Sequence, residues 1–600
     1  RVVTINRNRL FGKRQRKFNS QENGRLTMIQ RACVRGTGKV FVFVALCLFP
    51  FFIQSAGVAG QEMLDFSGCV IVTPGKLGKV EQKAVVVLQE EIEKRTGIRL
   101  AKTDRWPKPP KSIIAVGLQC QINQFAGPFS TNIKDIDIRG NEGFCLVVKT
   151  KPQRAALIIG RDARGVLYGI GRLLRKMHLT HQSILVPDGL NITASPKYPL
   201  RGHQLGYRPK TNAYDAWSVA QFDQYIRELA LFGTNSIELI PPHSDDDRTS
   251  RHMKVPALEM MMRMSEICDS YGLDVWIWYP NVGKDHIGPE AVKKELAERE
   301  EIFKKLKRID HILVPGGDPG HLHPDAFFPW MDKMARVLER YHPKAKIWVS
   351  PQAMQPTRKW LDCFYKYVNR KPKWLGGVVF APWVKTPLPK MRGIVDKQLP
   401  IRRYPDITHN VACQYPVKDW DLAFAITLHR ECFNPRPVAM KKIHNAFDEY
   451  ACGSITYSEG INDDINKFVW GDQDWDPGTS VIETLRDYCR LFISPKFAEE
   501  ITQGFMAQEK NWQGPLAANA QVDVTLQQWR DLENNVPDAV KANYRFQMGL
   551  MRAYYDAYIK RRLIYETELE LKAMDALRSA SQTGSLESVG KAAKILRKAK

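Results

Sequence analysis

The feature that most constrains the fold is a regular alternation of short β-type runs and longer helical stretches between residues 198 and 480. Such an alternation is typical of parallel βα units. We predict eight strands, near 201–207, 235–240, 273–279, 311–315, 346–350, 376–381, 401–406 and 453–458. Eight strands at this spacing predict a (β/α)8 TIM barrel over residues 198–480.

The flanking segments follow other patterns. Residues 61–197 contain apolar runs at 70–72, 113–116, 143–149 and 156–160, and two segments with helical spacing at 81–95 and 164–177. We therefore expect a small α+β domain before the barrel. After about residue 480 the β-type runs disappear, which predicts a helical C-terminal region over 481–600. The chain as a whole is of the α/β class.

The first 60 residues have a different character from the rest. Residues 1–39 hold eleven Lys and Arg against the single Glu22, and an apolar run follows at 40–53, ahead of small residues at 55–60. This order predicts a signal peptide at about 28–60, and the apolar run is shorter than the roughly 20 residues of a membrane span. We expect export to the periplasm or beyond, without stable membrane insertion after cleavage.

Charge and cysteines narrow the function classes. Ten of the 25 excess positive charges precede residue 40, and the other 15 are spread over a long chain, so we expect no nucleic-acid partner. The nine cysteines after the signal peptide are scattered and form no C-x-x-C pair, which argues against a thiolate zinc site. We expect mainly buried free thiols, with one or two disulfides left open, and no cofactor.

One stretch resembles a known family. The segment Glu142-Gly-Phe-Cys-Leu, followed by Leu157-Ile-Ile-Gly-Arg-Asp-Ala-Arg-Gly-Val-Leu-Tyr-Gly-Ile-Gly-Arg-Leu-Leu, is similar to the N-terminal domain of bacterial β-hexosaminidases. The junction at 196–203 also resembles their entry into the barrel. These enzymes, glycoside hydrolase family 20, and the related α-glucuronidases of family 67 place such a domain before a TIM barrel. The resemblance implies a carbohydrate-active enzyme.

The resemblance also bears on the fourth strand. In family 20 this strand ends in Gly-Gly-Asp-Glu, where the Glu is the general acid and the Asp orients the acetamido group of the substrate. Here Gly316-Gly317-Asp318 matches and Pro319 replaces the acid. Because proline cannot transfer a proton, the acid is expected from another strand. The run at 457–467 resembles the eighth-strand region of exported glycosidase-like proteins, some linked to endo-acting β-N-acetylglucosaminidases.

Glycoside hydrolysis needs a carboxylic acid and usually a second carboxylate, unless the substrate supplies the nucleophile. Four carboxylates at predicted strand ends are the candidate catalytic residues: Glu238, Asp318, Asp406 and Glu459, with Asp318 and Glu459 leading. Each has a structural alternative. Asp318 lies in a turn-forming sequence, Glu238 can pair with Arg201 or Arg208, and Asp406 can anchor the proline-rich loop.

Aromatic and polar residues at the same predicted strand ends are candidate sugar ligands, because sugar rings stack on aromatic faces while their hydroxyls need polar partners. The aromatic candidates are Tyr207, Trp278, Tyr279 and Trp383. The polar candidates are His203, Gln204, His243, His321, Gln352 and His409. Core packing is the alternative for each aromatic residue.

Together these patterns predict an exported glycoside hydrolase that cleaves β-linked N-acetylhexosamine glycans by retaining or substrate-assisted catalysis. Three alternatives stay open. They are an inverting hydrolase resembling the α-glucuronidases, a glycan-binding barrel without activity, and a metal-dependent hydrolase built on His321 and His323. A single H-x-H pair is weak evidence for a metal, so none is expected.

Overall fold

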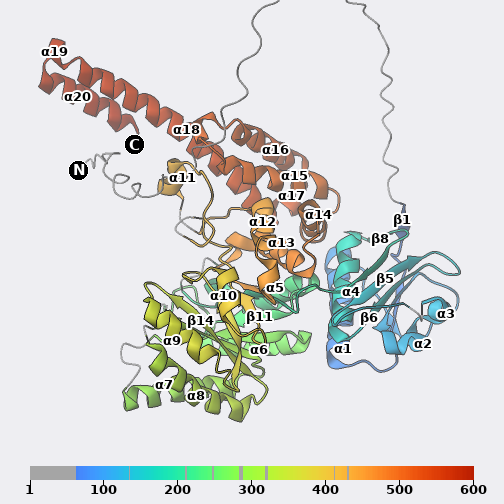
Figure 1. The fold of residues 1–600 in the computed structure, drawn as a ribbon. Helices are drawn as coiled ribbons and strands as arrows, with labels where there is room; N and C mark the ends of the chain where they lie inside the picture. Colours follow the sequence, from blue (N-terminus) through green and yellow to red (C-terminus); the bar gives the residue numbers. More distant parts are fainter. Residues whose placement is uncertain are drawn as a thin grey trace, which may run out of the picture. The chain divides into compact units, whose positions relative to one another are not determined.

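The computed structural model describes residues 62–133, 136–209, 213–245, 249–282, 288–317, 320, 322–410, 413–428 and 431–599. The described residues belong to one compact unit, which Figure 1 draws in colour. The predicted signal peptide lies outside the described residues, as do Asp318, Pro319 and His321. The domain boundaries at 197 and 480 stay predictions.

The N-terminal part contains two sheets. A mixed sheet has the strand order β3-β2-β4-β6-β5-β9, and a small antiparallel sheet has the order β1-β8-β7. The strands are β1 Met63–Asp65, β2 Val70–Val72, β3 Lys102–Thr103, β4 Ile113–Leu118, β5 Phe144–Lys149, β6 Ala155–Gly160, β7 His178–Thr180, β8 Ser183–Pro187 and β9 Asn191–Ala194. Four helices belong to this part: α1 Lys79–Thr96, α2 Ile122–Phe125, α3 Ser130–Ile133 and α4 Ala163–Lys176. The predicted α+β pattern is thus present.

Helix α4 shows how the resembling segment folds. Asp162 caps its N-terminus by accepting a hydrogen bond from the backbone N–H of Gly165 at 2.9 Å. A Cβ atom on Gly165 would lie 2.1 Å from the carbonyl oxygen of Gly143. Glycine is therefore required where this helix approaches strand β5.

Eight parallel strands close into a barrel in the order β10 to β17. They are β10 Leu200–Gln204, β11 Ser236–Leu239, β12 Asp274–Trp278, β13 His311–Gly317, β14 Lys346–Ala353, β15 Leu375–Phe380, β16 Ile401–Arg403 and β17 Gly453–Thr456. Each overlaps one predicted strand, in the predicted order. The TIM-barrel prediction is confirmed.

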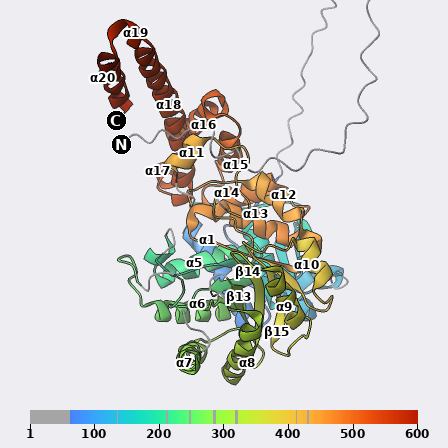
Figure 2. The same ribbon diagram turned by 60° about the vertical axis from the view of Figure 1, so that its left-hand side comes forward.

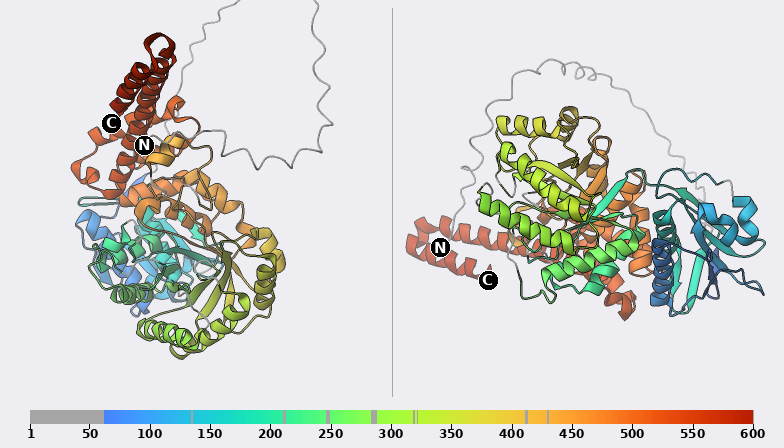
Figure 3. Two further views of the ribbon diagram at one scale, coloured as in Figure 1. Left: turned by 90° about the vertical axis from the view of Figure 1, so that its left-hand side faces the viewer. Right: turned by 90° about the horizontal axis from the view of Figure 1, so that it is seen from below.

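Side chains alternate between the barrel interior and its helical shell, as the period of two requires. Leu200, Trp276, Leu313 and Trp348 belong to the interior cluster. Their neighbours along the strands join the larger cluster under the helices. Figures 2 and 3 show helices on the outside of the strands: α5 Val219–Leu231, α6 Ala257–Tyr271, α7 Pro289–Lys305, α8 Pro324–Tyr341, α9 Arg358–Val368, α10 Leu388–Ile394 and α13 Asp464–Trp475.

The C-terminal region is helical, as predicted. Two further helices, α11 Leu422–Thr427 and α12 Pro437–Asn445, precede β17. After α13 come α14 Val481–Phe492, α15 Ala498–Gln508, α16 Gln521–Asn535, α17 Asp538–Lys541, α18 Tyr544–Arg578, α19 Ala580–Thr583 and α20 Ser585–Leu596. Helix α20 runs back along the 35-residue helix α18. Among the described residues no helix combines the length and the apolarity that crossing a membrane requires.

Arg545 of α18 joins the helical region to the barrel shell. Its guanidinium donates to Asp464 of α13 at 2.8 Å and to Glu228 of α5 at 2.7 Å, and all three groups are buried. Asp464 also accepts hydrogen bonds from Tyr225 at 2.6 Å and Tyr488 at 2.5 Å. Paired and hydrogen-bonded in this way, the buried charges are tolerated.

None of the nine described cysteines forms a disulfide. Cys69, Cys145, Cys268 and Cys489 are buried, and Cys120 is exposed. The prediction was of mainly buried free thiols: all nine are free, but only four of them are buried.

Candidate active site at the barrel mouth

Three of the predicted site residues meet at the carboxyl end of the barrel. Asp406 follows β16 and forms a parallel bridge with Tyr457, which follows β17. The Nδ1 atom of His409 lies 2.9 Å from Asp406 Oδ2, and its Nε2 atom lies 3.3 Å from Glu459 Oε2. Asp406, His409 and Glu459 therefore form one chain of contacts at the place where TIM barrels carry their chemistry.

Asp406 holds this arrangement together through the backbone. Its Oδ1 atom accepts hydrogen bonds from the backbone N–H groups of Thr408 at 3.2 Å and His409 at 3.1 Å. The turn fixes the position of the His409 backbone, and the contact with Oδ2 fixes the orientation of the imidazole ring. Asp406 is thus a positioning group for His409, which fits the loop-anchoring alternative raised for it.

Glu459 is the least satisfied carboxylate of the site. Its side chain is 1 % exposed, yet neither of its oxygens accepts a geometrically sound hydrogen bond from the described residues. Its partners are ionic contacts, with His409 at 3.3 Å and with Arg208 Nη2 at 3.7 Å. A buried carboxylate normally has its lone pairs filled. Glu459 therefore keeps acceptor capacity that a hydroxyl or a water can use.

His409 is surrounded by carboxylates on both ring nitrogens. Its Nε2 atom also lies 3.2 Å from Glu431 Oε1, and the Tyr457 ring stacks on it with a centroid distance of 5.4 Å. Burial alone would lower the pKa of the His409 imidazole, but the neighbouring carboxylates of Asp406, Glu431 and Glu459 outweigh burial and raise this pKa from 6.5 to about 11. His409 is accordingly a cation at neutral pH.

Arg208 brings a second cation to the mouth. It is buried, lies 3.4 Å from Asp245 Oδ1 and 3.5 Å from the Tyr457 hydroxyl, and its guanidinium lies 5.7 Å from the centre of the Trp278 ring. Trp278 belongs to the cluster of buried residues in the barrel interior, which is also what the core-packing alternative predicts for it. The mouth thus combines an indole with opposite charges.

Glu238 lies in a deeper layer of the barrel and has a different partner from the two that the sequence suggested. It pairs with Arg402 Nη2 at 2.5 Å, whereas Arg201 binds Glu142 and Arg208 lies at the mouth. Gln204 donates to Glu238 Oε1 at 3.2 Å and to the hydroxyl of Tyr404. Burial raises the pKa of Glu238, and the Arg402 ion pair only partly offsets this effect. Because Arg402 comes from the seventh strand, sequence distance concealed the pair.

Three predicted sugar ligands point away from the barrel interior, which corrects their placement at the mouth. His203 bonds Thr456 at 2.8 Å and faces Gly471 of α13. Tyr207 packs on Phe222, and Tyr279 packs on Phe303 with Arg299 above its ring. A strand sends adjacent side chains to opposite faces, and these three belong to the outer face or its loops.

The remaining predicted ligands divide between mouth and rim. Gln352 is buried at the end of β14. Trp383, which follows β15, is 45 % exposed, so a ligand can reach its ring. Its φ of 66° is a strained backbone conformation for a tryptophan. His243 is half-buried and contacts Glu298 of α7 at 3.1 Å. Asp318 and His321 lie outside the described residues.

The sequence reasoning missed three residues of the mouth as site residues: Arg208, Glu431 and Tyr457. Tyr457 lies two residues before Glu459, so the strand period was a usable signal for it. Arg208 and Glu431 come from loops, where no periodicity indicates direction.

Comparisons with known proteins place the fold. No protein-family model matches the chain, and no curated protein matches it either. The chain is similar to many solved structures, two of which are CpGH84B and CpGH84D. CpGH84B has a TM-score of 0.55 and 12% sequence identity, over 90% of this chain and 94% of that chain. CpGH84D has a TM-score of 0.51 and 12% identity, over 90% and 92%.

Both names refer to glycoside hydrolase family 84, which is related in fold to family 20 but distinct from it. At this identity the likeness concerns the fold alone, and it covers 90% of this chain. The family 20 resemblance is therefore refined to a fold shared with a second glycoside hydrolase family.

Within the described residues, one group at the mouth, of which Glu431 is partly exposed, has the atoms of a metal site. The ligand atoms of His409, Glu431 and Glu459 lie within 4.8 Å of one another. The imidazolium of His409 already supplies the positive charge that the carboxylates require. A cation would have to displace this proton.

Proposed function

We propose that the chain is an exported glycoside hydrolase acting on glycans with a β-linked N-acetylhexosamine. The observation that carries this proposal is Glu459, a buried carboxylate with unfilled acceptor capacity at the mouth of a closed TIM barrel. The guanidinium of Arg208 lies beside it, and the indole of Trp278 lies 5.7 Å from that guanidinium; the two groups suit the hydroxyls and the stacking face of a sugar. The fold shared with the family 84 proteins supports the same class.

In the proposed reaction, the bound substrate replaces the ionic contacts of Glu459 with His409 and Arg208, the carboxylate takes up a proton from solvent, and this proton passes to the glycosidic oxygen as the bond to the anomeric carbon breaks. The acetamido oxygen of the substrate forms the new bond to that carbon, and Asp318, which follows β13 in sequence, orients the acetamido group. Water then opens the cyclic intermediate and returns a proton to the Glu459 carboxylate. His409, held by Asp406, steadies Glu459 between the two steps.

Pro319, in place of the family 20 acid, favours a second candidate function, glycan binding without turnover. The two functions differ in a direct measurement. Turnover by the purified exported chain is measured on aryl glycosides and N-glycans, and binding of the same glycans is measured by calorimetry. Saturable binding without release of product from any substrate would exclude the hydrolase.

We expect Asp318→Asn and Glu459→Gln each to lower kcat by at least about 100-fold, the lower end for a general acid or base. The matched control is Glu290→Gln, an exposed carboxylate in the first turn of α7, which should leave kcat unchanged. NMR of the first-formed anomer separates retention from the inverting alternative. Near-normal rates in either variant would remove that residue from the mechanism.

A further inference from the structure

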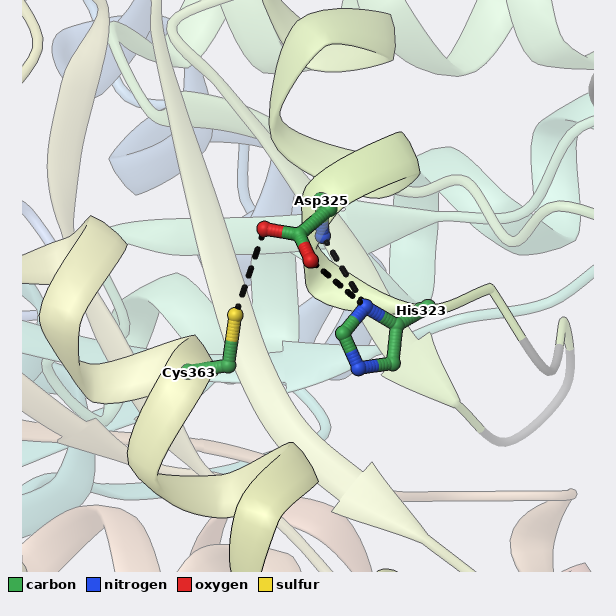
Figure 4. Close-up of side chains that lie close together, drawn as sticks. All are labelled: His323, Asp325 and Cys363. Carbon is green, nitrogen blue, oxygen red and sulfur yellow. Dashed lines mark hydrogen bonds and ion pairs between the residues drawn. The ribbon is translucent and has the colours of Figure 1, made fainter.

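A second cluster of potential metal ligands lies outside the barrel mouth, between helices α8 and α9. Figure 4 shows His323, the N-cap of α8, Asp325 in its first turn and Cys363 from α9. His323 Nδ1 lies 3.2 Å from Asp325 Oδ2, and the Cys363 thiol donates to Asp325 Oδ1 at 3.4 Å. An imidazole, a carboxylate and a thiol thus meet at the surface.

The spacing of these atoms fits a tetrahedral ion. Bonds of about 2.0–2.3 Å from zinc to nitrogen, oxygen and sulfur place neighbouring ligand atoms roughly 3.3–3.7 Å apart. The separations are 3.2 Å from His323 Nδ1 to Asp325 Oδ2 and 3.4 Å from Cys363 Sγ to the other oxygen, Oδ1. One ligand atom from each of the three residues can be chosen so that all three lie within 4.8 Å of one another. Only small side-chain movements are needed to surround an ion, and solvent can supply the fourth ligand.

The surroundings hold the ligands in place. The Tyr367 hydroxyl donates to Asp325 Oδ1 at 2.9 Å, the kind of outer contact that orients a ligating carboxylate. Tyr367 itself stacks on Phe328 of α8 with a centroid distance of 4.8 Å. The Trp360 indole donates to the carbonyl of Leu322 at 3.1 Å, which ties the segment before α8 to α9.

The same geometry argues against a nucleophilic cysteine. A catalytic thiol needs a base that accepts its proton and a lowered pKa. Cys363 donates to a carboxylate instead of to the imidazole, and burial followed by the neighbouring Asp325 raises the pKa of its thiol. A bound divalent cation would instead lower the pKa of this thiol, because it stabilises the thiolate that it binds.

We propose that His323, Asp325 and Cys363 form a binding site for a divalent transition-metal ion of the zinc class. On binding, the thiol of Cys363 releases its proton to solvent, a metal–sulfur bond forms, and the metal joins the segment that precedes α8 to helix α9. Nitrogen, oxygen and sulfur donors together favour such an ion over magnesium or calcium. The site goes beyond the proposed hydrolase function and does not rest on it.

The test is a Co²⁺ titration of the full chain, followed by competition with Zn²⁺ against a chromophoric chelator. A sulfur-to-cobalt charge-transfer band is expected at one equivalent, and Zn²⁺ should abolish it. The band reports only on a thiolate ligand, so a metal bound by the oxygens and nitrogen at the barrel mouth would not produce it. Turnover is measured separately, which keeps this result independent of the hydrolase proposal.

Cys363→Ser should remove the band and lower the Zn²⁺ affinity by more than 100-fold, whereas Tyr367→Phe should lower it by about 10-fold. The matched control is Cys120→Ser, which removes an exposed thiol outside the cluster and should retain both band and affinity. His323→Ala is expected to weaken Zn²⁺ binding as well, and the exposed His181→Ala is not. Absence of the band in the wild type, or its persistence in Cys363→Ser, would overturn the proposal.

Discussion

Two buried glutamates of the same barrel, Glu238 and Glu459, differ in how completely their carboxylate oxygens are paired. Glu238 lies in the inner layer and has a guanidinium at 2.5 Å and an amide donor at 3.2 Å. Glu459 lies at the mouth and has only ionic contacts beyond 3.2 Å. From sequence both are acidic residues near the end of a strand. Because of these surroundings, Glu238 serves the structure of the barrel, whereas Glu459 can still bind a hydroxyl or a water.

The two glutamates contribute differently to the free energy of unfolding. A buried ion pair stabilises a fold only while both partners are present, because either charge left alone is costly. A buried carboxylate with unfilled lone pairs gives up part of the stability that full hydrogen bonding would provide, as functional sites often do. The inner layer is therefore expected to respond to substitution through stability, and the mouth through activity.

The largest expected effect is on stability in the inner layer. Arg402→Ala leaves Glu238 buried without its partner and should lower the free energy of unfolding by about 3–5 kcal/mol. Urea denaturation followed by circular dichroism measures this change. The control is Arg358→Ala, which removes an exposed arginine paired with Asp362 and should change stability little. A small effect of Arg402→Ala would show that the two layers do not differ as described.

An intermediate effect is expected from the charge on His409. The pKa of this group is raised from 6.5 to about 11 in the folded chain, so its contribution to stability is fully present below about pH 6.5 and is lost as the pH rises toward 11. The stability difference between wild type and His409→Gln should therefore shrink between pH 6.5 and 9.5, with a slope of at most about 1.4 kcal/mol per pH unit.

Urea denaturation of both proteins at several pH values measures this difference, and the subtraction removes groups that titrate alike in both. A difference that is constant over this range would mean that His409 is neutral in the folded chain.

The smallest expected effect is on the stability of the mouth. Glu459→Gln should change the free energy of unfolding by no more than about 1 kcal/mol, because the two cations beside it keep other carboxylates, His409 with Asp406 and Glu431 and Arg208 with Asp245. The same denaturation experiment measures it. A loss as large as that of Arg402→Ala would place Glu459 among the structural charges.

The barrel could be predicted from the sequence because its strands are apolar runs bounded by helical segments, and each run is local information. The Asp406, His409 and Glu459 group could be predicted as members of one site because the ends of parallel strands meet at one edge. The Glu238 and Arg402 pair could not, since its members lie 164 residues apart and no local pattern links them.

The direction in which a side chain points was harder to predict than the position of its strand. Adjacent residues on β10, His203 and Gln204, were both expected at the mouth, yet only Gln204 faces the interior. Both residues are polar, so the alternation of side chains along the strand does not show which of the two faces the barrel interior. Arg208 and Glu431 lie in loops, whose course depends on packing that the sequence does not express locally.

The anchoring of α18 by Arg545 has a consequence for biosynthesis. Two carboxylates in the barrel shell, Asp464 and Glu228, depend on a guanidinium that follows them by 81 and 317 residues. As the chain emerges from its N-terminus to its C-terminus, the barrel strands are complete long before this arginine, and both acids lack their partner until it appears. The barrel is thus expected to reach its final packing only after residue 545 has emerged, and a premature stop before residue 545 should yield a chain that quality control removes.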